Sequence, residues 1–352
     1  MVRARRLAAA ALVAVGSGVL GVPAAAASAA PAAPEDLCTV SDPRLAELSG
    51  LAVRGDEIWA MSDGGARATV YRLDPGDCAI TDTERADLDP FDAEDLAPGP
   101  DGAFWIGDTG DNDRRRETVA LLVLPPRGEP GLHRLTYPDG PHDAEALLVG
   151  ADGVPVVVTK EVTGIAGVYR PAEPLAEPGP TPLLRVGSVG FARSETTGGP
   201  IGALGALTVT GGAVSADGRD VALRTYTDAW LYRVPPSGDL VAALQTTPLQ
   251  VPLPDEPQGE AIAFLPDGTL LSGSETRGRS GRLRAVPGAV EAALATAPAE
   301  SAAPPAPAAP PPVAAPPEPA PEWRPAVIGV GAVVLVLGAA AGAMTLHARR
   351  RG

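Results

Sequence analysis

One short pattern recurs five times through the middle of the chain and limits the folds that it can adopt. A polar residue opens an apolar run, an aspartate stands seven residues later, and a second apolar run ends seven residues after that. The opening residues are Ser49, Glu94, Glu145, Thr210 and Glu260, and the aspartates are Asp56, Asp101, Asp152, Asp217 and Asp267. In four of the five copies glycine follows the aspartate, which is typical of a tight hairpin between two strands.

The copies begin 45, 51, 65 and 50 residues apart. Hairpin units with periods of this length are typical of β-propellers, in which the ring of blades supplies the core that no single blade can bury. We therefore predict an all-β fold, a five-bladed propeller over residues 35–290, with 240–249 as the outer strand of its fourth blade. Six blades remain an alternative if residues 198–209, inside the longest interval, build part of a degenerate blade.

The N-terminus has the pattern of a secretory signal peptide over residues 1–29. Arg3, Arg5 and Arg6 precede an apolar run, and the small residues Ala27-Ser28-Ala29 offer a cleavage site. A membrane anchor is the alternative, but a spanning helix needs roughly 20 apolar residues and this run is shorter. The pattern therefore predicts export.

The C-terminus divides into three segments. Residues 298–324 form the first segment, of which 298–321 are almost entirely alanine and proline with scattered glutamate, a composition that predicts an extended stalk. Residues 325–346 are uncharged and apolar, long enough for a transmembrane helix, and residues 347–352 form a basic tail that stays in the cytoplasm. We predict a single-pass type I protein of the cell membrane with an extracellular propeller.

An exported chain folds under oxidising conditions, and this one has two cysteines, Cys38 and Cys78. An even pair predicts a disulfide, with two unpaired buried thiols as the alternative. Residues 37–40 form a strand without a partner before the first blade, and the last blade lacks its outermost strand. Pairing the two would close the ring and remove two exposed sheet edges.

The chain is strongly acidic. Without the six arginines of its two ends it carries 22 basic and 43 acidic residues, a net charge of −21. Nucleic-acid binding needs clustered lysine and arginine, so we exclude a nucleic-acid partner. The partners that remain are the membrane, through the C-terminal helix, and an unknown extracellular ligand or protein.

Charged residues recur where the repeat frame reaches the mouth of the central channel, which the innermost strands line. The predicted ligand-binding residues are Asp63, Glu94, Asp108, Glu145, Lys160, Arg224, Glu260 and Glu275. Lys160 is the only lysine of the chain. Such a ring of charges is either a self-satisfied polar plug or a ligand site, and the sequence leaves both open.

The loop from residue 108 to 113 has the densest group of oxygen side chains. Asp108, Asp111, Asn112 and Asp113 predict a metal site, since Ca²⁺ takes six to eight oxygen ligands in a flexible cage. Its twelfth position is Val119, where an EF-hand has glutamate, so a solvated turn is the alternative. No Gly-x-Ser-x-Gly motif or zinc-binding pattern accompanies it, and catalytic residues stay unassigned.

Four phrases resemble those of exported bacterial propellers of the TolB-like and phytase-esterase-like group. They are Asp92-Ala-Glu-Asp-Leu-Ala, Gly107-Asp-Thr-Gly-Asp-Asn, Asp143-Ala-Glu-Ala-Leu and Gly259-Glu-Ala-Ile-Ala. The resemblance, over about residues 45–275, implies a propeller and permits Ca²⁺. Our leading hypothesis is a non-enzymatic module that binds a ligand or protein at the channel mouth. The alternative is a Ca²⁺-dependent phosphoesterase or esterase.

Overall fold

A computed structural model describes residues 31–276 and 279–296. The predicted signal peptide, stalk, membrane helix and basic tail lie outside these residues. Within the described part of the chain, no helix is long and apolar enough to cross a membrane.

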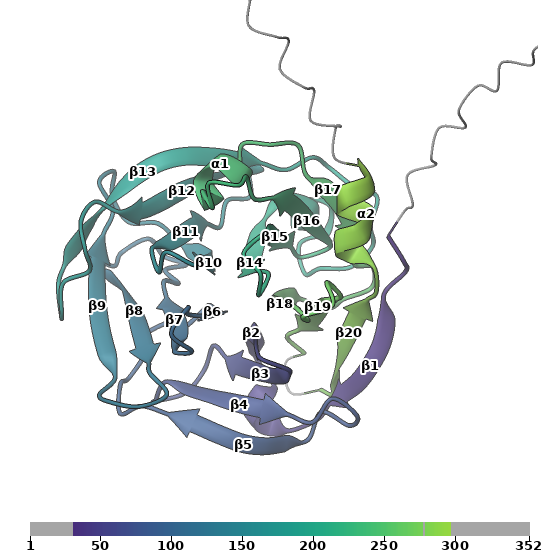
Figure 1. The fold of residues 1–352 in the computed structure, drawn as a ribbon, viewed down its shortest axis with the longest axis horizontal. Helices are drawn as coiled ribbons and strands as arrows, with labels where there is room; N and C mark the ends of the chain where they lie inside the picture. Colours follow the sequence, from purple (N-terminus) through teal and green to yellow (C-terminus); the bar gives the residue numbers. More distant parts are fainter. Residues whose placement is uncertain (1–30, 277–278, 297–352) are drawn as a thin grey trace, which may run out of the picture. The chain divides into compact units, whose positions relative to one another are not determined.

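The described residues form a β-propeller, in which antiparallel four-stranded meanders surround a central axis (Figure 1). The strands nearest the axis are β2 (Leu48–Arg54), β6 (Asp95–Pro98), β10 (Ala144–Val149), β14 (Val209–Val214) and β18 (Gly259–Phe264). They are buried on both faces almost throughout, which explains their near-continuous apolar sequences.

The other strands follow each innermost strand outward. The second strands are β3 (Glu57–Ser62), β7 (Phe104–Asp108), β11 (Pro155–Thr159), β15 (Asp220–Thr225) and β19 (Leu270–Ser274). The third strands are β4 (Thr69–Leu73), β8 (Val119–Leu124), β12 (Ile165–Pro171), β16 (Asp228–Arg233) and β20 (Gly281–Val286). The outermost strands are β5 (Ile80–Arg85), β9 (Gly131–Thr136), β13 (Thr181–Gly190), β17 (Leu249–Pro252) and β1 (Glu35–Val40).

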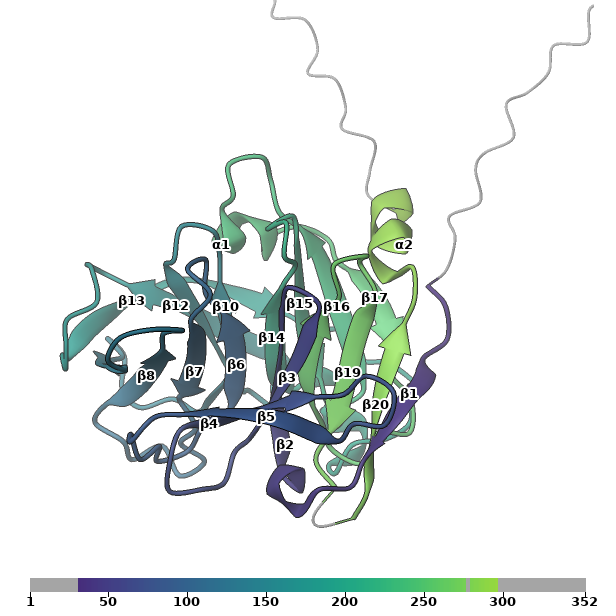
Figure 2. The same cartoon turned by 60° about the horizontal axis from the view of Figure 1, so that its bottom comes forward.

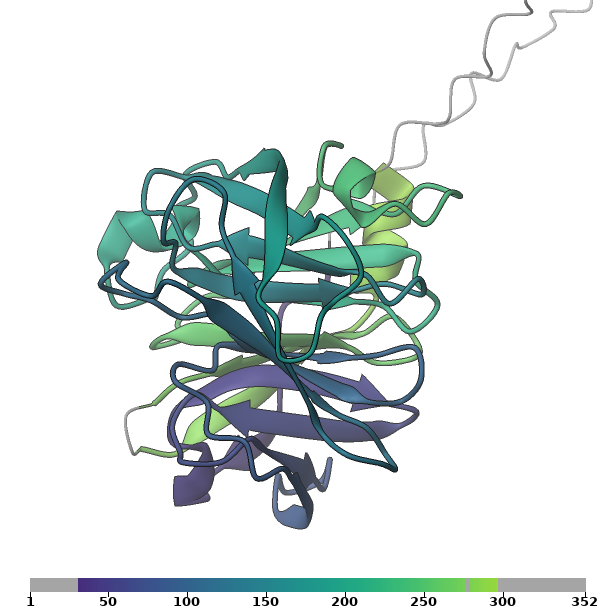
Figure 3. The ribbon, with the colours of Figure 1, turned by 90° about the vertical axis from the view of Figure 1, so that its left-hand side faces the viewer.

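Hydrogen bonding joins these strands into three sheets of four and one of eight. The eight-stranded sheet consists of two consecutive meanders, β6 to β9 and β10 to β13. A short parallel contact between β13 and β9, with Thr181 opposite Leu135, links them. The side view in Figure 3 shows neighbouring sheets face to face. Their apolar side chains pack between them, as Leu148 and Val158 of one sheet do with Leu223 of the next.

The predicted closure of the ring is confirmed. β1 pairs antiparallel with β20, from Glu35 opposite Ala285 to Val40 opposite Gly281, and Figure 2 shows the two strands side by side. The predicted disulfide is also confirmed, because Cys38 of β1 is bonded to Cys78 in the loop between β4 and β5. The disulfide therefore ties the sheet that holds both β1 and β20 to the sheet of β2 to β5.

One local prediction was wrong, and the alternative of extra strands in residues 198–209 is not what the structure shows. Residues 240–249 do not form one strand, because Asp239 accepts hydrogen bonds from the backbone N–H groups of Val241 and Ala242 and begins the short helix α1 (Leu240–Ala243). The strand β17 follows only afterwards. Residues 198–209 form mainly the 3₁₀-helix η2 (Gly202–Leu207), whose Leu207 is buried against a core cluster, rather than extra strands.

Two further short elements complete the described part. The 3₁₀-helix η1 (Pro43–Leu45) connects β1 to β2, and the sequence did not predict the helix α2 (Ala289–Thr296) after β20. Ala289 of α2 is buried against Val251, Phe264 and their neighbours, and Ala292 is also buried. The folded body therefore extends a few residues beyond the predicted limit of 290.

Candidate functional site

The repeat position at the start of the innermost strands lies on a β-bulge in four sheets. On β10, for example, Ala144 pairs with Thr159 and Ala146 with Val158, so Glu145 is an extra residue with no partner on β11. The same register shift occurs at Ser49, Thr210 and Glu260. A bulge re-aims the side chain of the extra residue.

The bulged residues act in two ways. The hydroxyls of Ser49 and Thr210 donate hydrogen bonds to the backbone carbonyls of Glu94 and Gly259 in the next sheet, the second over 2.7 Å. They join neighbouring sheets near the axis. The glutamates at this position instead belong to a cluster of acidic side chains at the same end of the ring.

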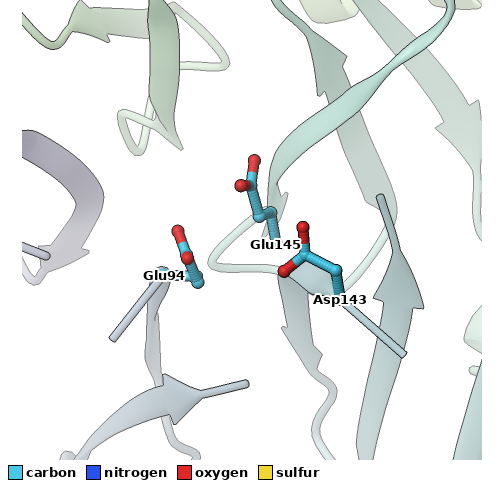
Figure 4. Close-up of side chains that lie close together, drawn as sticks. All are labelled: Glu94, Asp143 and Glu145. Carbon is cyan, nitrogen blue, oxygen red and sulfur yellow. The ribbon is translucent and has the colours of Figure 1, made fainter. Parts of the chain in front are cut away.

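The centre of that cluster consists of Glu94, Asp143 and Glu145, which come from the two neighbouring meanders of the eight-stranded sheet (Figure 4). One carboxylate oxygen from each lies within 4.8 Å of the other two. All three side chains are buried, with exposed fractions of 6%, 5% and 2%. This spacing would allow the three oxygens to hold one metal ion between them.

Each of the three carboxylates has at least one oxygen that accepts no hydrogen bond from the described residues. Asp143 accepts a 2.8 Å hydrogen bond from the Asp111 N–H through Oδ1, and Glu145 forms an ion pair with Lys160 through Oε1. The buried Oε2 of Glu145 has no hydrogen-bond partner. Among the described residues, the Glu94 carboxylate has no hydrogen-bond or ion-pair partner either. Buried carboxylates are normally paired, protonated or bound to metals, and the three carboxylates of this centre could bind a metal ion.

Further acidic side chains surround this centre. We call the whole set the axial carboxylate cluster, which comprises Asp63, Asp92, Glu94, Asp143, Glu145, Glu260 and Glu275. Gln258 donates hydrogen bonds to Glu260, over 2.9 Å, and to Glu275. Burial and the neighbouring carboxylates raise the pKa values of Glu94 and Glu145 well above the usual range. Lys160 is the counter-charge within the cluster, and its partners raise its pKa despite its burial.

The cluster should make the stability of the folded protein depend on pH. Burial, followed by the charges of Glu47, Glu260, Glu275 and Asp92, raises the pKa of Asp63 to about 7. Burial likewise raises the pKa of Glu260 to about 7. Both groups are therefore largely protonated in the folded state at pH values where they are already ionised in the unfolded chain.

In the absence of divalent cations we expect the free energy of unfolding to fall as pH rises from about 4 to about 7. A carboxyl group with a raised folded-state pKa stabilises the fold fully below its unfolded pKa. That contribution is lost as pH rises through the folded value. Urea unfolding at stepped pH in EDTA measures the slope, which Asp63→Asn should reduce and the exposed Asp152→Asn should not. A flat or rising profile would contradict the assignment.

The predicted calcium loop lies beside the cluster but uses its carboxylates differently. Asp111 accepts hydrogen bonds from the backbone N–H groups of Arg115 and Arg116, and Asp108 accepts from those of Phe91 and Asp92. The other two predicted ligands, Asn112 and Asp113, are exposed. The metal-compatible group of three contains none of the four, and calcium binding by the loop itself stays a prediction.

The loop does support the site. Its Asp111 N–H holds Asp143, and a Cβ on Gly110 would lie 2.3 Å from Oε1 of Glu94 and 2.5 Å from the carboxylate of Asp92. A larger residue at position 110 would therefore force both acidic side chains to move. Asp143 and Asp92 were not among the predicted site residues, although both stand in the quoted phrases two residues before a repeat-position glutamate.

Arg224 was predicted at the channel mouth but is fully buried, with an exposed fraction of 0%. Its guanidinium donates to Glu256 over 2.7 Å, to Ser272 over 2.9 Å and to backbone carbonyls that include that of Ala261 over 3.0 Å. These contacts join β15 to the sheet of β18 and β19. Arg224 is therefore a structural link between two sheets.

Asp95 is a second buried ionisable residue, and it was not among the predicted site residues. Its carboxylate accepts hydrogen bonds from the backbone N–H groups of Leu96, Leu147 and Gly212, which lie on three different innermost strands. Burial outweighs these hydrogen bonds and raises its pKa to about 8. The sequence signal that could have identified Asp95 is an aspartate at the start of an otherwise apolar strand.

The chemistry of the central group suits a hard cation. Its three donors are carboxylate oxygens, which favour Ca²⁺, Mg²⁺ or Mn²⁺ over metals that prefer nitrogen or sulfur ligands. Three protein ligands fall short of the six to eight that Ca²⁺ takes. A cation held here would keep coordination positions open to water or to an added ligand.

Comparisons with known proteins add no function. No protein-family model matches the chain, and no curated protein matches it in sequence. Among solved structures, a streptogramin B lyase is 14% identical with a TM-score of 0.32, and the match covers 68% of this chain and 65% of the lyase. A gluconolactonase from Xanthomonas campestris is 16% identical with a TM-score of 0.39, and the match covers 68% of this chain and 71% of the gluconolactonase. The PQQ-bound aldose sugar dehydrogenase from Streptomyces coelicolor is 12% identical with a TM-score of 0.40, and the match covers 73% of this chain and 99% of the dehydrogenase. These similarities are too low to transfer an activity to this chain.

Proposed function

We propose that this protein is a cell-surface propeller that binds a divalent cation, in the first place Ca²⁺, at the mouth of its central channel and uses that cation to hold an extracellular ligand. The observation that carries the proposal is the convergence of Glu94, Asp143 and Glu145, with a buried carboxylate oxygen of Glu145 left unpartnered. Lys160 alone does not balance the carboxylates around it. A divalent cation would supply the missing positive charge.

The proposal extends to the parts of the chain outside the described residues. A signal peptide at 1–29 exports the chain, and an apolar helix at 325–346 anchors it, with residues 298–324 as a stalk. Each of the five four-stranded meanders counts as one blade. The open coordination positions then face the extracellular medium, where Ca²⁺ is abundant enough for a site of modest affinity.

Addition of CaCl₂ to the purified full-length protein should raise its stability. A ligand that binds the folded state alone stabilises it by RT ln(1 + [L]/Kd), about 2.7 kcal/mol at a hundredfold excess over Kd. Glu145→Gln should abolish this gain, because it removes a charged ligand while keeping a side chain of nearly the same shape. Isothermal titration calorimetry and urea unfolding in CaCl₂, MgCl₂ and EDTA measure the effect.

The matched control is Glu173→Gln, since Glu173 is exposed and lies between β12 and β13, away from the cluster. That variant should respond to Ca²⁺ as the unaltered protein does. If neither calorimetry nor unfolding distinguishes CaCl₂ from EDTA in the unaltered protein, the cluster is a polar plug and the proposal is wrong.

A hydrolase is the second candidate, because Asp63 and Glu260 carry pKa values of about 7 beside the proposed cation. A general acid or base works best when its pKa lies near the working pH, and a cation can polarise an ester carbonyl. Turnover of ester or phosphoester substrates that depends on Ca²⁺ and is lost in Glu260→Gln would favour this candidate over a binding module.

A further inference from the structure

The ligand class of the proposed cation site follows from which hydrogen-bonding groups surround it. This inference rests on the proposed function. The side chains of Asp63 and Asp92 are only partly buried, and among the described residues neither accepts a hydrogen bond nor forms an ion pair. Asp92 lies beside Glu94, since a Cβ on Gly110 would contact both carboxylates, and Asp63 lies close enough to Asp92 and Glu260 to interact electrostatically with them. The rim of the site therefore offers carboxyl oxygens that accept no hydrogen bond from the described residues.

Donors for an anionic ligand are scarce at the same place. The Lys160 ammonium is already paired with Glu145. Arg116 donates to Asp108 over 3.1 Å and to the Gly110 carbonyl over 2.7 Å, and Arg224 is enclosed. A phosphate or carboxylate group would face several carboxylates at close range, and like charges on neighbouring groups repel. The surroundings thus disfavour an anionic ligand even with one divalent cation in place.

A neutral hydroxyl group can fill an open coordination position of the cation and can also donate a hydrogen bond to a carboxylate at the rim. Its oxygen can coordinate the cation as water does, and its O–H can donate a hydrogen bond to a carboxylate, which in its ionised form accepts hydrogen bonds but donates none. Two adjacent hydroxyls on one molecule can fill two open coordination positions while donating to two rim carboxylates. Such an arrangement would use Asp63 and Asp92, whose oxygens otherwise lack donors.

We infer that the ligand held through the cation is a neutral, polyhydroxylated molecule, a carbohydrate with adjacent free hydroxyl groups, and that Asp63 and Asp92 accept hydrogen bonds from it. The juxtaposition of an incomplete cation centre with unpaired rim carboxylates carries this inference. It assigns these two residues a role in ligand recognition that is separate from holding the cation.

The test uses saturation-transfer-difference NMR on the full-length protein. The neutral probes are the methyl glycosides of glucose, galactose, mannose and N-acetylglucosamine, and the anionic probe is glucose 6-phosphate, each in CaCl₂ and in EDTA. At least one neutral glycoside should give a signal in CaCl₂ that EDTA abolishes, and glucose 6-phosphate should bind at least tenfold more weakly. Asp63→Asn with Asp92→Asn should weaken binding of the neutral probe about tenfold, whereas the exposed Asp101→Asn in the hairpin at the opposite end of the strands should not.

Calorimetry with CaCl₂ alone separates this inference from the proposed function. If Ca²⁺ binds but no neutral glycoside gives an EDTA-sensitive signal, or if glucose 6-phosphate binds more tightly, the inferred ligand class is wrong and the cation site stands. If the double variant binds the neutral probe as tightly as the unaltered protein, the assignment of Asp63 and Asp92 is wrong. Failure of Ca²⁺ itself to bind would overturn both.

Discussion

Replacement of Arg224 by alanine is expected to lower the free energy of unfolding by about 3 to 5 kcal/mol, the range for removing one partner of a buried ion pair. Arg224 is fully enclosed, and its loss would leave the buried Glu256 with the hydrogen bond from the Ser272 hydroxyl, 2.6 Å, and a longer ion pair, 3.5 Å, with Arg284. The backbone carbonyls of Ala261 and Gly273 would also lose a charged donor. Urea unfolding followed by circular dichroism measures the change.

Arg219→Ala is the matched control for this prediction. Arg219 directly precedes β15, the strand that contains Arg224, but its side chain is 69% exposed and its contact with Asp217 is long, at 3.8 Å. Surface substitutions of this kind usually change stability by no more than about 0.5 kcal/mol. A loss below about 1 kcal/mol in Arg224→Ala would show that the buried pair is not a significant link between the two sheets.

Removal of the disulfide is expected to have a comparable effect. Cys38 and Cys78 are separated by 40 positions, and a cross-link that closes a loop of this length contributes about 4 kcal/mol in the chain-entropy model. It also fixes β1, which is needed to complete the sheet of β20. The double variant Cys38→Ser with Cys78→Ser should therefore unfold at a much lower urea concentration than the oxidised protein.

Reduction of the unaltered protein with dithiothreitol provides the comparison for the disulfide. If chain constraint is the cause, the reduced protein and the double variant should show similar losses of stability. Equal stability of the oxidised protein and the double variant would contradict the prediction. A large loss in the variant alone would point instead to the packing of the two buried sulfur atoms.

The propeller was predictable because its signal is periodic and local. The five copies of the hairpin pattern specify inner strand pairs, and an unpartnered strand at Leu37 could be assigned to the opposite end of the domain by its missing partner. The outer elements carry weaker signals. An apolar run that begins at Leu240 suits a strand or a helix, and the decision depends on the capping carboxylate of Asp239.

The candidate site was predictable only in part, for a geometric reason. The repeat frame identified Glu94 and Glu145 as equivalent residues of different blades, and the structure places them together with Asp143. The same frame assigned Arg224 to the mouth, because it cannot tell which way a long side chain turns at the end of a strand. The sequence also could not predict the bulge at Glu145 or the close approach of Gly110 to Glu94. Both depend on how the strands pair and pack in the folded protein.

The pairing of β1 with β20 imposes an order of events on the chain as it is made. Asp36 of β1 and Arg282 of β20 form an ion pair although they are 246 positions apart. If the chain crosses a membrane from its N-terminus onward, β1 emerges first and has no partner until nearly the whole domain has followed. Its unpaired edge is exposed to wrong pairings throughout that interval. A chaperone outside the membrane that covers short unpaired strands would therefore act first on residues 35–40.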